Sequence, residues 1–256
     1  MVAMTSKAAS TATADVNRAA KARYDLADRG DFGDADRGFI APIPDRRTVN
    51  EAGKVVYDGS VYDFITDDQS NPDTVNPALW RQAQIMRRAG LYKVVDRLYQ
   101  VRNSSLANVT IVEGDDGLIV IDTATSVETA RQALALFREH VVDKPVVAVI
   151  YTHTHIDHYA GIKGVVDEAD VAAGRVPIIA PGTVASFDKH ALGENVIAGN
   201  AMIRRASYPF GGLLAPGPRG FVTCGIGCGA NHNETVTYLS PPTRSPKPVR
   251  YAIFQG

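Results

Sequence analysis

The segment 152–159, Thr-His-Thr-His-Ile-Asp-His-Tyr, constrains this chain more than any other part of it. It places three of the chain's six histidines and one carboxylate within six consecutive positions. Removing so many ligand-type side chains from water together is unfavourable unless a cation compensates. The apolar run 146–151 just before it is typical of a buried strand in an α/β fold, and catalytic groups in such folds lie where strands end. The pattern therefore predicts a metal centre at a strand end.

The alternation within this segment indicates which side chains can share an ion. Side chains of an extended chain alternate between two faces, so His153, His155 and Asp157 tend to project to one side. His153 and His155 can then bind one metal, whereas Asp157 and His158 are adjacent and need a turn, which residues 158–166 can supply as the start of a helix. Such a loop offers ligands to two zinc ions, which hold a hydroxide when about 3.5–4 Å apart. The alternative is a solvated loop that is rich in histidine by chance, and the spacing favours the metal.

The composition excludes several other classes of protein. The length of 256 residues suits one large domain, or one domain with an arm. The net charge of −1 gives no electrostatic reason to expect a nucleic-acid partner. No apolar stretch approaches the roughly 18–20 residues of a membrane span, and residues 1–22 contain no apolar core of a secretory signal. We therefore expect a cytoplasmic protein without a membrane span.

The two cysteines do not indicate a disulfide framework. Cys224, Cys228 and His232 form a C-x3-C-x3-H array, which is one possible zinc knuckle. The array has only three ligands, its spacing is unusual, and glycines separate its members. We favour free thiols in a glycine-rich loop.

Local patterns predict where regular structure lies. Residues 1–50 are polar and broken by Gly and Pro, which favours a surface arm, partly disordered at its start. Asn76 and Gly90 are expected to cap the two ends of one helix. We predict two parts, namely an N-terminal arm with this helix over 1–90 and a second domain over 91–256. Further expected elements are a strand pair or extended segment around 58–59, a strand at 98–101, a hairpin of 109–112 and 118–121, a helix over 126–140, strands at 146–151 and 177–181, and a helical stretch over 183–205 that is interrupted near Gly193 and Gly199.

A hairpin, a helix and a strand followed by His-x-His-x-Asp-His resemble the metallo-β-lactamase superfamily. The resemblance implies an α/β fold, the αββα sandwich, here incomplete and preceded by the arm. Asp122 ends the hairpin where that superfamily often has an aspartate supporting the metal loop through hydrogen bonds to a ligand. A simple cap at the strand end is the alternative for Asp122.

A closer resemblance is to the alkyl sulfatase family within that superfamily, over residues 25–220. It rests on residues 74–82, 90–96, 106–110, 125–130 and, above all, 194–208. The resemblance implies hydrolysis of sulfuric esters of medium or long alkyl chains, such as dodecyl sulfate, to alcohol and sulfate. It also implies two zinc ions with a bridging hydroxide, with His153, His155, Asp157 and His158 as metal ligands and Asp157 as a catalytic residue.

Four further residues are candidates for binding the substrate. A sulfate monoester is anionic, so Arg204 and Arg205 are candidates for holding its oxygens, with a structural ion pair as the alternative for each. Asn200 and Tyr208 are candidates for lining the pocket, with a structural hydrogen bond as the alternative.

The chain departs from the family pattern after about residue 220. The loop supplies four metal ligands, whereas two zinc ions need about seven to nine ligand positions, solvent included. In the family, the remaining ligands, a helical dimerisation domain and a lipid-carrier-like domain follow further along, so the homodimer of the family is expected without its dimerisation region here. We expect a truncated member with weak metal binding and little activity, the alternative being a shortened natural variant. Two other functions stay open: another hydrolase of the superfamily, acting on lactams, thioesters or phosphodiesters, and a non-catalytic remnant.

Overall fold

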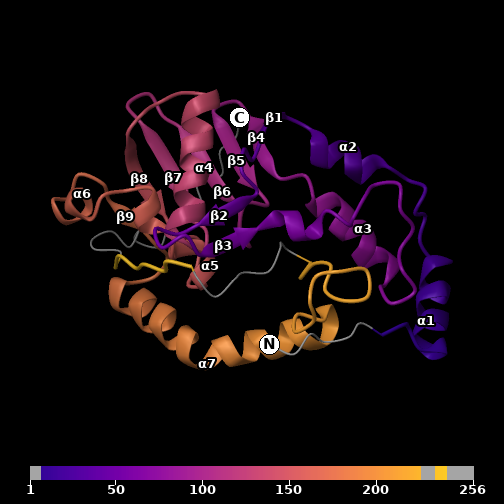
Figure 1. The fold of residues 1–256 in the computed structure, drawn as a ribbon. Helices are drawn as coiled ribbons and strands as arrows, with labels where there is room; N and C mark the ends of the chain where they lie inside the picture. The colour runs from indigo at the N-terminus through magenta and orange to yellow at the C-terminus, as the bar shows by residue number, and fades with distance from the viewer. Residues whose placement is uncertain (1–6, 226–233, 241–256) are drawn as a thin grey trace.

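The computed structural model describes residues 7–225 and 234–240. Within these residues the main sheet has seven strands in the order β1-β4-β5-β6-β7-β8-β9, and a smaller sheet pairs β2 with β3 (Figure 1). The strands of the main sheet are β1 (Phe39–Pro42), β4 (Gly90–Val95), β5 (Leu98–Arg102), β6 (Val109–Glu113), β7 (Leu118–Ile121), β8 (Val146–Ile150) and β9 (Ile178–Ile179), and those of the smaller sheet are β2 (Arg47–Val49) and β3 (Val55–Asp58).

The strand pairing in the main sheet changes from antiparallel to parallel at β7, and this change positions the site. Neighbouring strands from β1 to β7 are antiparallel, whereas β7, β8 and β9 are parallel. The predicted hairpin is confirmed, with Thr110 opposite Ile121 and Glu113 opposite Leu118. Since β5, β7 and β8 run the same way, the loops after all three meet at one edge of the sheet. The histidine loop, residues 152–158, follows β8 at this edge.

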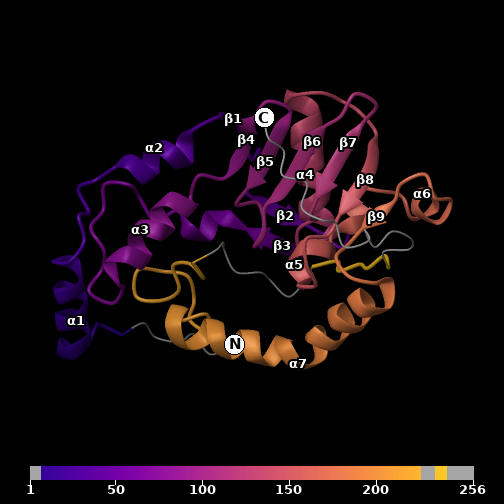
Figure 2. The same cartoon turned by 180° about the vertical axis from the view of Figure 1, so that it is seen from behind.

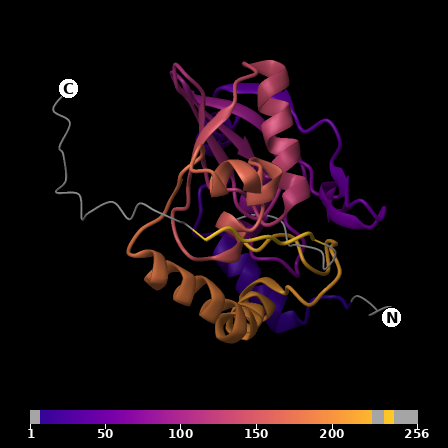
Figure 3. The same cartoon turned by 90° about the vertical axis from the view of Figure 1, so that its left-hand side faces the viewer.

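Helix α4 (Val127–His140) covers one face of the sheet (Figure 3). Its N-cap is Ser126, as predicted, because the Ser126 side chain accepts a hydrogen bond from the backbone N–H of Thr129. The buried face of the helix packs on the strands, and the Phe137 ring lies 5.2 Å from the Tyr99 ring in an edge-on arrangement. This contact between helix and sheet forms the main hydrophobic core.

The opposite face of the sheet carries aliphatic side chains that are only half buried. The register places Val112 beside Ile119, and Ile121 beside Ile150, which in turn lies beside Ile179. All five are intermediate in exposure, whereas their neighbours on the α4 side are buried. The alternation of the strands thus leaves an apolar strip on this face.

The N-terminal region is more regular than the sequence indicated. It forms α1 (Thr11–Lys21), α2 (Gly30–Asp36), the 3-10 helix η1 (Gly59–Tyr62) and α3 (Pro77–Met86), beside the sheet (Figure 2). A second core gathers around Trp80 of α3, with Tyr62, Ile65 and Phe221. The surface-arm expectation is corrected for 39–42, because β1 joins the main sheet by pairing with β4. The division at residue 90 stays a prediction.

One expected boundary in this region was wrong. Asn76 caps α3 as predicted, but the helix ends at Met86, and Gly90 opens β4 instead of closing the helix. A Cβ at Gly90 would lie 2.5 Å from the Ala41 carbonyl oxygen, so the close approach of β1 explains this glycine. Around Asp58, the chain forms β3 and then η1, and the partner of β3 is the preceding strand β2.

The histidine loop leads into short helices and then into one long helix. These are α5 (Ile156–Tyr159), η2 (Ile162–Gly164), α6 (Glu168–Ala172) and α7 (Val184–Phe210), which runs below the strand ends that carry the loop (Figure 1). The predicted interruptions of the last helix near Gly193 and Gly199 are wrong, because α7 is continuous through both. A glycine inside a helix costs only about 1 kcal/mol relative to alanine, which is too little to end it.

Candidate metal centre

The end of β7 supplies the residue that organises the site. Asp122 is 7% exposed and has a φ of 60°, in the left-handed region that aspartate tolerates better than most residues. Its Oδ1 accepts a hydrogen bond from the Thr152 backbone N–H at 2.8 Å, and its Oδ2 accepts one from the Thr152 hydroxyl at 2.7 Å. Oδ2 also lies 2.7 Å from Nδ1 of His158. One carboxylate thus holds both ends of the histidine loop.

The loop brings the three predicted imidazoles together. The ring centre of His153 lies 4.6 Å from that of His155 and 4.0 Å from that of His158. His155 is the N-cap of α5, so the turn begins earlier than the predicted 158–166 and turns Asp157 and His158 back toward the other rings. Asp157 is 9% exposed, and its Oδ2 lies 3.3 Å from Nε2 of His158. The four side chains are neighbours, and their role as ligands stays a prediction.

The donor set fits zinc in its chemistry. Three imidazoles and one carboxylate are groups that zinc binds, and Asp122 occupies Nδ1 of His158 so that Nε2 remains for an ion. In the described part of the chain, no three His, Cys, Asp or Glu side chains already adopt a geometry that could hold an ion. The contact between Asp157 and His158 gives a physical reason, because here the carboxylate pairs with the nitrogen that a metal would use.

Charges within the loop are strongly coupled. Burial lowers the pKa of His158, but hydrogen bonds and charge from Asp122 and Asp157 outweigh burial and raise the pKa to about 9. Burial raises the pKa of Asp157, and the contact with His158 outweighs it, so the pKa of Asp157 is lowered. Burial and the two neighbouring imidazoles lower the pKa of His153. Metal binding at this loop therefore has to displace a proton from His158.

The four predicted substrate-binding residues all lie on α7. Asn200, Arg204 and Tyr208 are spaced by four, so their positions follow one face of the helix. Tyr208 is 83% exposed and Arg204 is also exposed, while the side chains of Asn200 and Arg205 lie outside the described residues. The start of α7 reaches the end of β8, where the Phe187 ring stacks on the Tyr151 ring at 5.6 Å. The binding roles stay predictions.

The possible zinc knuckle falls largely outside the described residues. Cys224 is half buried, and Cys228 and His232 are not described. The other two histidines sit on helices: Nδ1 of His140 lies 3.1 Å from the Leu136 carbonyl oxygen, and Nδ1 of His190 lies 2.6 Å from that of Ser186. Both contacts are local to one helix turn.

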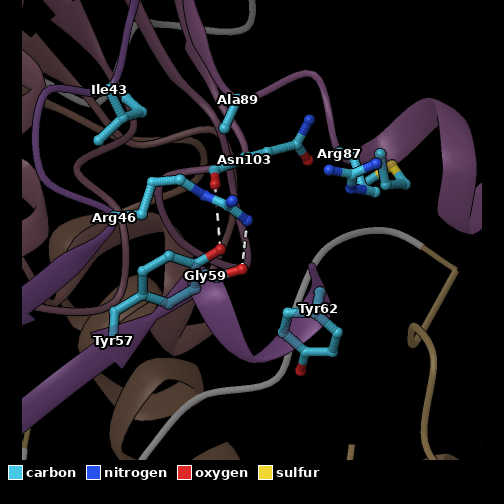
Figure 4. A pocket seen from close by; sticks show the side chains of 9 residues that line it. Ile43, Arg46, Tyr57, Gly59, Tyr62, Arg87, Ala89 and Asn103 are labelled. Atoms are coloured by element: carbon cyan, nitrogen blue, oxygen red, sulfur yellow. Dashed lines mark hydrogen bonds between the residues drawn. The ribbon is translucent and has the colours of Figure 1, made fainter. Parts of the chain in front are cut away.

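A small cavity lies at the end of α3 (Figure 4). Its volume is about 20 Å³, room for about one water molecule. The guanidinium of Arg46 points into it but already pairs with Asp63 and the Gly59 carbonyl, and Tyr57 donates to the Asn103 carbonyl at 3.1 Å. A second cavity, of about 210 Å³, is bordered by Asp25, Asp28 and Asp31. The first cavity is too small for an alkyl sulfate, and the aspartates around the second would repel its negative charge.

The segment 234–240 contacts residues that flank the histidine loop, and no sequence pattern predicted these contacts. Thr235 accepts from the Val127 backbone N–H at 3.0 Å, and Thr237 donates its backbone N–H to the Ala160 carbonyl at 2.8 Å. Tyr151, at the end of β8, donates its hydroxyl to the Leu239 carbonyl at 3.3 Å. We call residues 234–240 the strap, because it ties α4, the chain after α5 and the end of β8 together.

The strap makes stability depend on pH through Glu234. Burial, and then the charge of Glu128, raise the pKa of Glu234 to about 7. The folded protein therefore holds this proton more tightly than the unfolded chain, and stability falls as pH rises from about 4.5 to 7. Glu234→Gln should raise the free energy of unfolding at pH 8 by on the order of 1 kcal/mol, about 2–4 °C in Tm, after discounting for solvent screening.

Thermal unfolding at pH 4.5 and pH 8 checks this expectation. The Tm difference between Glu234→Gln and the unsubstituted chain should be present at pH 8 and absent at pH 4.5. Glu51→Gln, at an exposed turn, is the control and should change Tm equally little at both pH values. An equal gain at both pH values for Glu234→Gln would contradict the role of its ionisation.

Comparison with known proteins identifies the fold. Residues 103–219 match the family model described as the metallo-beta-lactamase superfamily. The structure also superimposes on the sec-alkylsulfatase Pisa1 of a Pseudomonas species with a TM-score of 0.83 and 46% sequence identity, over 93% of this chain and 37% of that one. The protein therefore has a mixed α/β metallo-β-lactamase fold, as predicted from the sequence.

The curated relatives are more specific. The chain is 49% identical to a linear primary-alkylsulfatase of a Pseudomonas species over 241 residues, which are 94% of this chain and 35% of the relative. It is 46% identical to the alkyl/aryl-sulfatase BDS1 of Saccharomyces cerevisiae, over 90% of this chain and 35% of that protein. The chain thus carries an alkylsulfatase-like metallo-β-lactamase domain, and it spans about a third of the length of the relatives it matches. In the described residues, no helix is long and apolar enough to cross a bilayer.

Proposed function

We propose that this domain hydrolyses alkyl sulfate esters, releasing an alcohol and sulfate, at a zinc centre built on the histidine loop. The observation that carries the proposal is the convergence of three imidazoles and Asp157 at the end of β8, held there by Asp122. Sequence identities of 46–49% to proteins named as alkylsulfatases support this substrate class over the lactams, thioesters and phosphodiesters of other superfamily members.

Each residue of the loop has a proposed role. His153, His155, Asp157 and His158 would hold zinc, two ions in the complete centre, with Asp157 also in contact with the reacting groups. Zinc supplies a Lewis acid for the ester oxygens and lowers the pKa of a water molecule. Asp122 holds Nδ1 of His158 and the Thr152 backbone, so it would keep the loop in place while Asp157 leaves Nε2 of His158 to an ion.

The proposed substrate contacts come from α7. Arg204 and Arg205 would offset the charge of the sulfate group, because a guanidinium can bind two oxygens of an oxyanion at once. Asn200 and Tyr208 would line the substrate pocket on the same side as the two arginines. The exposure of Arg204 and Tyr208 leaves both side chains free to meet a substrate.

Zinc titration by calorimetry together with an assay of sulfate release tests the proposal. The loop supplies four ligands, fewer than two zinc ions need, so we expect weak zinc binding and slow turnover of dodecyl sulfate. His153→Ala with His155→Ala should abolish both, while His140→Ala, at an exposed helix end, should change neither.

A substrate panel separates the competing hydrolases. At saturating zinc, the chain should release sulfate from dodecyl sulfate faster than it opens a β-lactam or cleaves a thioester or phosphodiester. Cleavage of one of these without sulfate release would contradict the substrate class. No zinc binding at all would contradict the metal centre.

A further inference from the structure

The contacts of the Thr152 hydroxyl define a short chain of hydrogen bonds. Its oxygen lies 2.7 Å from Oδ2 of Asp122 and 3.0 Å from Nδ1 of His153. A threonine hydroxyl has one proton to donate, and an ionised carboxylate can only accept. The hydroxyl proton therefore lies toward Asp122, and the hydroxyl oxygen is left to accept a hydrogen bond.

The acceptor role of this oxygen decides the tautomer of His153. A neutral imidazole carries its proton on one nitrogen and a lone pair on the other. If the Thr152 oxygen accepts, Nδ1 of His153 must carry the proton, and Nε2 must carry the lone pair. The tautomer therefore decides which of the two ring nitrogens can face an ion.

We propose that Thr152 is a positioning residue that fixes His153 as its Nδ1–H tautomer, with Nε2 presented to the metal. The proposal rests on the proposed function for the identity of the ligand, but the tautomer itself is a property of the metal-free chain. The same Asp122 oxygen lies 2.7 Å from Nδ1 of His158. One carboxylate therefore orients two imidazoles, His158 directly and His153 through the Thr152 hydroxyl.

His155 provides an internal comparison. The ring centre of His155 lies 4.6 Å from that of His153, so both rings share one environment. The hydrogen bonds of the Thr152 hydroxyl, however, go to His153 and Asp122. Removing the Thr152 hydroxyl should therefore change the tautomer of His153 and leave that of His155 as it was. A general disturbance of the loop would change both rings.

Long-range ¹H–¹⁵N NMR of the metal-free, ¹⁵N-histidine-labelled chain at pH 8 tests the proposal. In the unsubstituted chain and in Thr152→Ser, which keeps the hydroxyl, Nδ1 of His153 should be protonated. Thr152→Val, which keeps the shape without the hydroxyl, should shift His153 toward the Nε2–H tautomer that free imidazole prefers in water. Zinc affinity should then fall about 10-fold in Thr152→Val, typical for the loss of a group that orients a ligand, and stay unchanged in Thr152→Ser.

Two results would overturn the proposal: an Nε2–H tautomer for His153 in the unsubstituted chain, or an unchanged tautomer in Thr152→Val. If Thr152→Val does not fold, Thr152→Ala gives the same readout, because it also lacks the hydroxyl. A tautomer shift in a chain that binds no zinc would uphold the positioning role and contradict the metal centre instead.

Discussion

Asp122→Ala is expected to abolish zinc binding and to lower the free energy of unfolding by about 3–5 kcal/mol, the usual cost of breaking a buried charge pair. The substitution leaves the Thr152 backbone N–H and Nδ1 of His158 without their acceptor. It also places alanine at a φ of 60°, which adds about 1–2 kcal/mol of backbone strain. The loop that holds all four proposed ligands loses its attachment to the end of β7.

Asp122→Asn separates the charge from the backbone conformation. Asparagine tolerates the left-handed region and keeps one carbonyl oxygen as an acceptor, so the loss of stability should be clearly smaller than for alanine. Zinc affinity should still fall by about 10–100-fold, because the amide holds an imidazole less firmly than the carboxylate does.

Urea unfolding and zinc calorimetry on both variants check these expectations. Asp116→Ala, in the turn between β6 and β7, is the control, because its side chain is exposed. It should leave zinc binding and stability within about 0.5 kcal/mol of the unsubstituted chain. Equal zinc affinity in Asp122→Ala and the unsubstituted chain would show that the loop holds its geometry without this carboxylate.

The parts of the fold that could be predicted are those encoded by local patterns. The hairpin of β6 and β7 follows from alternation around a polar turn, and α4 follows from the Ser126 cap with a periodic apolar face. The neighbourhood of the histidines could be predicted because they follow a strand end, whereas the turn of α5 that brings His158 to the other rings begins earlier than the sequence indicated. Local patterns thus located the candidate site and most of the sheet that supports it.

The parts that could not be predicted depend on contacts distant in sequence. Strand β1 is short and mostly exposed and ends in a proline, and it is a strand because β4 offers an edge. The strap is irregular chain, held by the Ala160 carbonyl after α5 and the Val127 N–H of α4, two contacts that no local pattern reveals. The partners of Asp122, Thr152 and His158, are also distant in sequence. Local patterns therefore could not distinguish a cap at the strand end from a residue that supports the metal loop.

Gly161→Ala is the second substitution with a large expected effect. A Cβ at this position would lie 1.9 Å from the Thr123 carbonyl oxygen and 2.5 Å from that of Ser126. Both are backbone atoms, and neither can swing away as a flexible side chain would. Thr123 is in addition held by its N–H bond to the His158 carbonyl at 2.9 Å, and Gly161 by its own to the Ala124 carbonyl at 3.2 Å.

The clash therefore has to move the chain after β7 away from the chain after α5. We expect a loss of at least about 3 kcal/mol in the free energy of unfolding, at the upper end for overpacking, together with weaker zinc binding because the same hydrogen bonds position His158. Gly193→Ala is the matched control: nothing lies within 4 Å of its added Cβ, and it sits inside α7. There alanine should raise stability by about 0.5–1 kcal/mol.

Comparing Gly161→Ala with Gly193→Ala in urea unfolding separates the effect of packing around the loop from the general gain in stability when alanine replaces glycine. Opposite signs are expected, since the same added methyl group meets backbone oxygens at residue 161 and open space at residue 193. A neutral Gly161→Ala that retains zinc binding would mean that the chain after α5 can move away from β7 without disturbing His158. The histidine loop would then owe its shape to Asp122 and the strap alone.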